Sequence, residues 1–117
     1  MASRMDRYNE SKNNITRSAK HQNMYNSISS SNYLNYENME NGKIEKCISS
    51  NTGTYVIMEL ENSEQEIDLI YDNKIYKGKK RLLGVYNNGK YELLYQFNIT
   101  IDDKQRHRFF FNYGKGW

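Results

Sequence analysis

Residues 82–97 read Leu-Leu-Gly-Val-Tyr-Asn-Asn-Gly-Lys-Tyr-Glu-Leu-Leu-Tyr-Gln-Phe, and this stretch decides the fold. Asn87-Asn88-Gly89-Lys90 separates two runs that are rich in aromatic and aliphatic side chains. Asparagine and glycine accept the positive φ that a tight primed turn requires. The two runs are therefore predicted to pair as an antiparallel hairpin.

The chain that follows Gly89 alternates between apolar and polar residues, as strands do. Over residues 91–101 one face carries apolar side chains, and only Leu94 interrupts the polar face. Over residues 107–113 one face carries His107, Phe109, Phe111 and Tyr113. Asp102-Asp103-Lys104-Gln105 lies between these two strands, so we expect it to close a second hairpin.

Two further strands are expected before the hairpin, at residues 55–60 and 67–71, with a turn at residues 61–65. The predicted fold is thus mainly β: a small antiparallel five-stranded meander, or a closed barrel of SH3-like or OB-like kind. We place this antiparallel β domain at residues 52–117. A core of this size is marginal, so a helix or a second copy of the chain in a homodimer could cover an open face.

Residues 1–51 are predicted to be a flexible arm and linker. Thr16 or Ser18 could cap a short helix near residues 16–28, in which His21, Met24, Tyr25 and Ile28 follow the spacing of one helical face. About three turns are too few for stability alone in water. The helix would have to dock on its own β domain or on a partner.

Composition favours a chain that is folded only in part. Hydrophobic residues make up 37% of it and the mean hydropathy is −1.00. Cys47 is the only cysteine, which excludes an intramolecular disulfide and favours a reducing compartment. No apolar run follows Arg4, Asp6 and Arg7, so we expect no signal peptide, no membrane span and a cytoplasmic location.

Charge is unevenly distributed along the chain. Residues 1–28 carry five basic and two acidic side chains, residues 29–73 two and nine, and residues 74–117 ten and three. Either the acidic and basic strands pair across the sheet, or the C-terminal half presents a basic surface.

Catalytic and metal-binding patterns are sparse, so we expect a non-enzyme without a metal or another cofactor. Zinc needs about four Cys or His ligands, and the chain has Cys47, His21 and His107. The acidic residues between 59 and 72 lack calcium-loop spacing and are typical of a solvated strand face.

Single-stranded nucleic acid is one candidate ligand, because small β domains bind it with aromatic side chains beside a basic groove. The alternative is that strand-edge lysines only protect against edge pairing. The residues predicted for the nucleic-acid face are Lys77, Lys79, Lys80, Arg81, Arg106, Arg108 and Phe110.

The arm is the other candidate, since segments with apolar anchors at helical spacing commonly bind a partner groove. The residues predicted to contact a protein partner are Arg17, Lys20, Met24, Tyr25 and Ile28. The preferred hypothesis is a cytosolic adaptor or regulator that binds a macromolecule through this arm and the basic β face. A single-strand nucleic-acid binder is the alternative.

A family resemblance lies in the same region. Arg4-Met5-Asp6-Arg7-Tyr8 and residues 17–25, Arg-Ser-Ala-Lys-His-Gln-Asn-Met-Tyr, resemble the opening of uncharacterised cytoplasmic proteins of low-GC Gram-positive bacteria. The resemblance implies a bacterial or phage source and a short docking segment ahead of varied C-terminal parts. Residues 52–117 resemble no known family.

Overall fold

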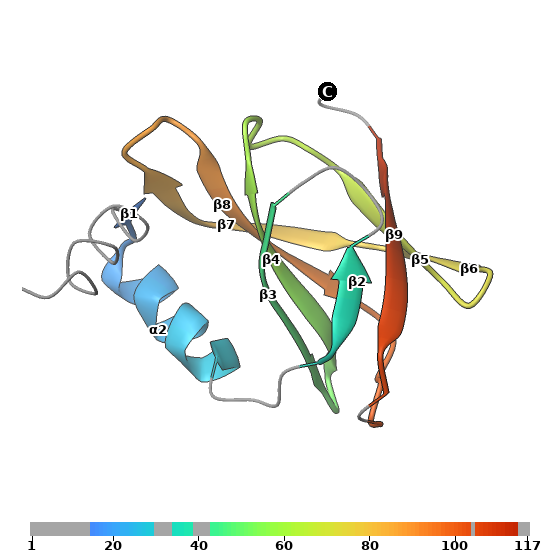
Figure 1. Cartoon of the computed structure of the whole chain (residues 1–117). Coiled ribbons are helices and arrows are strands. Elements are labelled where there is room, and N and C mark those ends of the chain that lie inside the picture. The colour runs from blue at the N-terminus through green and yellow to red at the C-terminus, as the bar shows by residue number, and fades with distance from the viewer. Residues whose placement is uncertain (1–14, 30–33, 39–42, 104, 115–117) are drawn as a thin grey trace, which may run out of the picture.

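The computed structural model describes residues 15–29, 34–38, 43–103 and 105–114, and Figure 1 labels their elements along the chain. The predicted tail at residues 1–14, residues 30–33 and 39–42 of the predicted linker, and Lys104 of the predicted second turn lie outside this range. The elements are β1 (Ile15–Thr16), α2 (Ala19–Ser29), β2 (Tyr36–Asn38), β3 (Lys43–Ser50), β4 (Gly53–Leu60), β5 (Ile67–Tyr71), β6 (Lys74–Lys77), β7 (Lys79–Tyr86), β8 (Tyr91–Phe97) and β9 (His107–Tyr113).

The strands form two sheets. The five-stranded sheet has the order β1-β7-β8-β4-β3 and is antiparallel throughout, and the four-stranded sheet has the order β2-β9-β5-β6. A mainly β fold with a five-stranded antiparallel sheet and one helix is therefore confirmed. One pair departs from the antiparallel expectation, because β2 lies parallel to β9.

Gly78 is the corner at which the chain passes from one sheet to the other. It separates β6, in the four-stranded sheet, from β7, in the five-stranded sheet, and its N–H donates to the Ile67 carbonyl at 3.0 Å. A Cβ at this position would lie 2.6 Å from the Ile67 oxygen and 3.0 Å from the Phe97 ring. A second link joins the sheets where the Leu34 N–H, just before β2, donates to the Cys47 carbonyl in β3.

The main core lies between the two sheets, and its members come from the inward faces of both. Their burial is the expected result of strands that alternate apolar and polar residues. The fully or largely buried residues of this cluster are Cys47, Val56, Met58, Leu60, Ile67, Leu69, Leu93, Tyr95, Phe97, Ile101, Phe109 and Phe111.

The hairpin predicted around Gly89 is confirmed, since β7 pairs with β8 on either side of it. Its turn is not of the primed type, because Gly89 alone in this turn has positive φ (86°). A type I turn followed by a left-handed glycine fits these angles. Both residues of Asp72-Asn73 have positive φ, so the primed turn lies between β5 and β6 instead.

The second predicted hairpin is wrong. β8 ends at Phe97 and pairs with β4 and β7, whereas β9 pairs with β5 and β2. The segment between them crosses from one sheet to the other and is held by β3 and β4. The Ile101 N–H donates to Ser49 Oγ at 2.8 Å, and Thr54 Oγ1 donates to the Ile99 carbonyl at 2.7 Å.

The structure also differs from the predicted boundary at residue 52. β3 lies before that boundary and pairs with β4 along its length, and Cys47 and Ile48 are buried. Alternation in Lys43–Ser50 is blurred by a bulge between Ile44 and Lys46, which explains why these residues have the pattern of a linker. The helix begins at Ala19 rather than near residue 16, because Ile15–Thr16 pairs with β7.

Replacing Gly78 by alanine should destabilise the fold by about 2 kcal/mol, the usual cost of overpacking a core. The new methyl group would press on the Ile67 carbonyl and on the Phe97 and Tyr95 rings. Urea unfolding measures the change. Gly114→Ala is the control, since its nearest neighbour would lie 3.7 Å away. Equal stability of the two variants would contradict the proposed corner.

Alkaline pH should weaken the fold through Cys47. Burial raises the pKa of its thiol from 9.0 to about 12, so between these values the unfolded chain loses a proton that the folded chain keeps. Stability from this group is complete below the lower value and is lost as pH rises toward the upper one. Urea unfolding at about pH 8 and about pH 10.5 should show a smaller loss of stability in Cys47→Ala than in the unmodified protein. An identical loss would refute the assignment.

Candidate functional site

The predicted arm helix docks on the five-stranded sheet of its own chain. Ser18 caps it, because its hydroxyl oxygen accepts the His21 N–H at 3.2 Å. Figure 1 shows α2 on the face of the five-stranded sheet that is turned away from β9. The apolar side chains of α2 pack there against a second core cluster. Met24, Tyr25, Ile28 and Tyr55 are half-buried there around Ile57, Leu83 and Leu94.

Arg17 joins the sheet to the helix. Its Nε and Nη2 donate to the two carboxylate oxygens of Glu92 in β8, at 2.7 and 2.6 Å, and its Nη1 donates to Gln22 Oε1 at 3.0 Å. The guanidinium carbon also lies 3.9 Å from the ring centroid of Tyr25. The hydrogen bond with Glu92 raises the pKa of Arg17, so the guanidinium stays charged although it is partly buried.

Glu92 requires such a partner because of its position. Its side chain is only 2% exposed, and it stands directly opposite Glu59 in the β4–β8 pair. Like charges in directly opposed positions repel, and a buried carboxylate without a partner is costly. Gly84 of β7 permits the approach of the arm, since a Cβ there would lie 2.7 Å from the Thr16 carbonyl and 2.9 Å from Arg17 Cγ.

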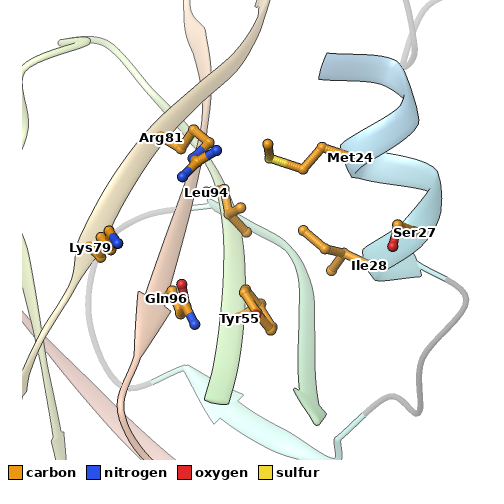
Figure 2. A pocket seen from close by; sticks show the side chains of 8 residues that line it. All are labelled: Met24, Ser27, Ile28, Tyr55, Lys79, Arg81, Leu94 and Gln96. Carbon is orange, nitrogen blue, oxygen red and sulfur yellow. The ribbon is translucent and has the colours of Figure 1, made fainter. Parts of the chain in front are cut away.

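A groove of about 380 Å³ opens between α2 and the sheet (Figure 2). Its lining residues are Met24, Ser27, Ile28, Tyr55, Lys79, Arg81, Leu94 and Gln96. Two of these side chains are fixed by the turn between β3 and β4. The Tyr55 hydroxyl shares a hydrogen bond of 2.7 Å with Thr52 Oγ1, and Gln96 Nε2 donates to the Thr52 carbonyl at 2.9 Å. The groove is therefore preformed.

The groove is apolar along the helix and cationic along β7. Figure 2 shows Met24 and Ile28 on one side and Lys79 and Arg81 on the other, with Leu94 between them. Within the described part of the chain, neither Lys79 nor Arg81 has a carboxylate within ion-pair distance. The groove thus combines aliphatic contact surface with two uncompensated positive charges.

The predicted nucleic-acid face is split between two sides of the molecule. Lys79 and Arg81 pair with Gln96 and Leu94 on the side covered by α2. Arg108 and Phe110 alternate with the buried Phe109 and therefore lie on the outer side of the four-stranded sheet.

Several of these basic residues are paired with carboxylates. Arg106 and Arg108 both contact Glu37 of β2, at 3.0 and 3.4 Å, and Lys80 contacts Glu64 at 3.3 Å. Lys77 is exposed in β6. For these residues, the contacts agree with the first alternative given for the charge distribution, in which acidic and basic segments pair with one another. Among the predicted basic residues, Lys79 and Arg81 line the groove, and no carboxylate of the described residues pairs with them.

A second cavity, of about 290 Å³, surrounds His107. The His107 side chain is 6% exposed, its Nδ1 hydrogen-bonds the Tyr71 hydroxyl at 2.7 Å, and its Nε2 lies 2.8 Å from Asp103 Oδ1. These contacts tie the segment before β9 to β5. Asp72, Asp103, Arg106 and Arg108 also line the cavity, so its charges of both signs offset one another.

No Cys–His pair forms in the described residues. Cys47 is buried in the main core, and His107 is engaged by Tyr71 and Asp103. Residues 15–29, 34–38, 43–103 and 105–114 also contain no group of three His, Cys, Asp or Glu side chains arranged to hold a metal ion. In the same residues, no helix has the length and apolar character needed to cross a membrane.

Four groove residues were not predicted as site residues: Ser27, Tyr55, Leu94 and Gln96. One signal for them exists in the sequence. Leu94 interrupts the polar face of residues 91–101, and an apolar residue at such a position indicates that something covers that face. The covering element is α2. Of the predicted arm residues, Met24 and Ile28 line the groove, Arg17 and Tyr25 hold the helix, and Lys20 is exposed.

Comparison with known proteins gives no relatives. The chain matches no protein-family model, no curated protein and no solved structure. The resemblance of residues 4–28 to bacterial proteins therefore stays a prediction.

Replacing Arg17 by methionine should lower the free energy of unfolding by about 3 kcal/mol, because Glu92 would stay buried without its partner. Lys20→Met is the control: it removes an exposed positive charge near the start of the same helix and should change stability by less than about 0.5 kcal/mol. Urea unfolding measures both. Adding Glu92→Gln to Arg17→Met should restore part of the loss, and equal effects of the two single substitutions would show that the ion pair does not hold the arm.

Proposed function

We propose that this chain is a non-enzymatic cytoplasmic interaction protein that holds a segment of a protein partner in the groove between α2 and the five-stranded sheet. One observation carries the proposal: among the residues that the structure describes, Lys79 and Arg81 have no carboxylate partner and line a groove whose opposite wall is aliphatic. Elsewhere Arg17, Arg106 and Arg108 each contact a carboxylate. Positive charge left without a partner beside exposed aliphatic surface is suited to a ligand that supplies both complements.

The groove has the properties of a recognition site. Its volume of about 380 Å³ lies near the lower end of the roughly 300–1,000 Å³ range of ligand pockets. Its lining combines apolar side chains with polar and charged ones. Met24 offers an adaptable side chain at one wall. Because hydrogen bonds already hold Tyr55 and Gln96 in place, these side chains lose less conformational entropy when a ligand binds.

The arm and the basic β face contribute jointly in this proposal. α2 supplies one wall through Met24 and Ile28, and β7 supplies the other through Lys79 and Arg81. Arg17 fixes the distance between the two walls by binding Glu92 and Gln22 together. The arm therefore acts as part of the binding site, whereas a free segment would have to fold on a partner. A single reduced cysteine in the core, Cys47, is compatible with the cytoplasm.

Single-stranded nucleic acid is the second candidate, because Tyr55 places an aromatic ring in the same groove as Lys79 and Arg81. Binding of this kind usually uses several aromatic rings along a basic groove. The remaining wall is aliphatic or polar, and Arg106 and Arg108 bind Glu37 on the opposite side of the molecule. The aliphatic wall supports a peptide ligand better.

Selection from a library of displayed random peptides tests this function. The library should yield peptides that bind the full chain and fail to bind Ser27→Tyr, because the larger side chain fills the groove from the exposed surface of α2. Asn23→Tyr is the control, as it adds the same side chain to an exposed position of α2 that does not line the groove. No enriched peptide, or equal binding to Ser27→Tyr, would refute the proposed function.

A further inference from the structure

The charge and shape of the groove indicate which class of peptide segment it binds, an inference that rests on the proposed function. We infer that the groove receives an extended acidic segment in which carboxylate side chains alternate with aliphatic ones. The carboxylates pair with Lys79 and Arg81, and the aliphatic side chains contact Met24, Ile28 and Leu94.

The spacing of the two cations carries the first half of the argument. Lys79 and Arg81 are separated by one residue in β7 and face the same side, opposite Gln96 and Leu94 of β8. Residues two apart in a strand are separated by roughly 6.6 Å. An extended peptide presents its side chains at positions i and i+2 with the same spacing and direction. Two acidic residues at such positions can therefore meet both cations at once.

The wall formed by α2 explains why aliphatic residues should alternate with the acidic ones. In an extended segment the residue between the two acidic ones points away from β7, toward α2. That direction ends at Met24 and Ile28, which are half-buried and lie across Leu94 from the cations (Figure 2). An aliphatic side chain there would bury apolar surface, whereas a charged one would lose hydration without a partner. Alternation of acidic and aliphatic residues thus matches both walls.

The buried carboxylates of the five-stranded sheet do not neutralise Lys79 and Arg81. Glu59 and Glu92 are turned toward Arg17 and Lys90, at ion-pair distances of 2.6 Å for Arg17–Glu92 and 3.9 Å for Lys90–Glu59. These acidic residues are thus engaged by cations that do not line the groove. No Asp or Glu is among the lining residues of the groove. Lys79 and Arg81 are therefore available to attract the carboxylates of a partner segment.

Fluorescence anisotropy with three labelled synthetic peptides tests the inference on the full chain. The first peptide alternates glutamate with leucine or isoleucine, the second replaces each glutamate by lysine, and the third replaces each aliphatic residue by serine. The first should bind at least about tenfold more tightly than either of the others, and its affinity should fall as salt is raised, because exposed ion pairs are screened. Equal binding of the first two peptides would overturn the inference.

Charge reversal gives the sharper test. Lys79→Glu with Arg81→Glu should invert the preference, so that the lysine peptide binds more tightly than the glutamate peptide. Lys74→Glu with Lys77→Glu is the matched control, since it changes net charge equally at two exposed positions of β6 outside the groove. It should leave the preference unchanged, and a preference that inverts in both variants would reduce the effect to net charge and overturn the inference.

The outcomes separate this inference from the proposed function. If displayed peptides bind the groove and lack acidic residues, the inference fails and the proposed function stands. If no peptide of any charge is blocked by Ser27→Tyr, the proposed function itself fails. A single-stranded oligothymidylate that binds in place of the glutamate peptide, and is lost in Lys79→Glu with Arg81→Glu, would overturn the inference in favour of nucleic acid.

Discussion

The contact between Arg17 and Glu92 is the interaction on which the rest of this structure depends. Glu92 is buried in the middle of the five-stranded sheet opposite Glu59, and the arm supplies the guanidinium that it needs. If one partner of a buried ion pair is removed, the other charge stays buried without compensation. The loss of folding free energy is then larger than the net contribution of the intact pair. The sheet is therefore complete only when the segment before α2 lies on it.

The docked arm sets the geometry of the groove. Arg17 reaches the sheet through two hydrogen bonds, and it contacts α2 through Gln22 and the Tyr25 ring. Gly84 allows the arm to approach the β7 backbone at the start of the helix. With both constraints in place, Met24 and Ile28 face Leu94, and Lys79 and Arg81 remain on the opposite wall. The proposed binding site is thus a consequence of how the charged arm is anchored.

Much of the fold is predictable because its signals are local. The alternation around residues 91–97 and the turn at Gly89 specify a hairpin, and Ser18 with Met24, Tyr25 and Ile28 specifies a short helix. Strand order is not local, so Asp102-Asp103-Lys104-Gln105 has the sequence of a hairpin turn although β8 and β9 belong to different sheets. β3 was not predicted as a strand because its bulge interrupts the alternation of apolar and polar residues.

The candidate site was only partly predictable for the same reason. Basic residues can be identified in the sequence, but their pairing cannot: Glu37 and Arg108 are far apart in the chain and meet only because β2 lies parallel to β9. Arg17 has the spacing of a partner-binding residue, and only the fold shows that its partner is Glu92. Leu94 was the one local sign of a covered face, since it places an apolar side chain where the pattern requires a polar one.

Amide hydrogen exchange of the isolated full chain, followed by NMR, tests the central claim that α2 is part of the folded unit. We expect the amides of the later turns of α2, around Tyr25, to be protected nearly as well as those of β8. Helices of this length exchange freely unless they are packed against other structure. Unprotected α2 amides beside a protected sheet would show that α2 is not docked in the free chain, and that the arm folds only on a partner.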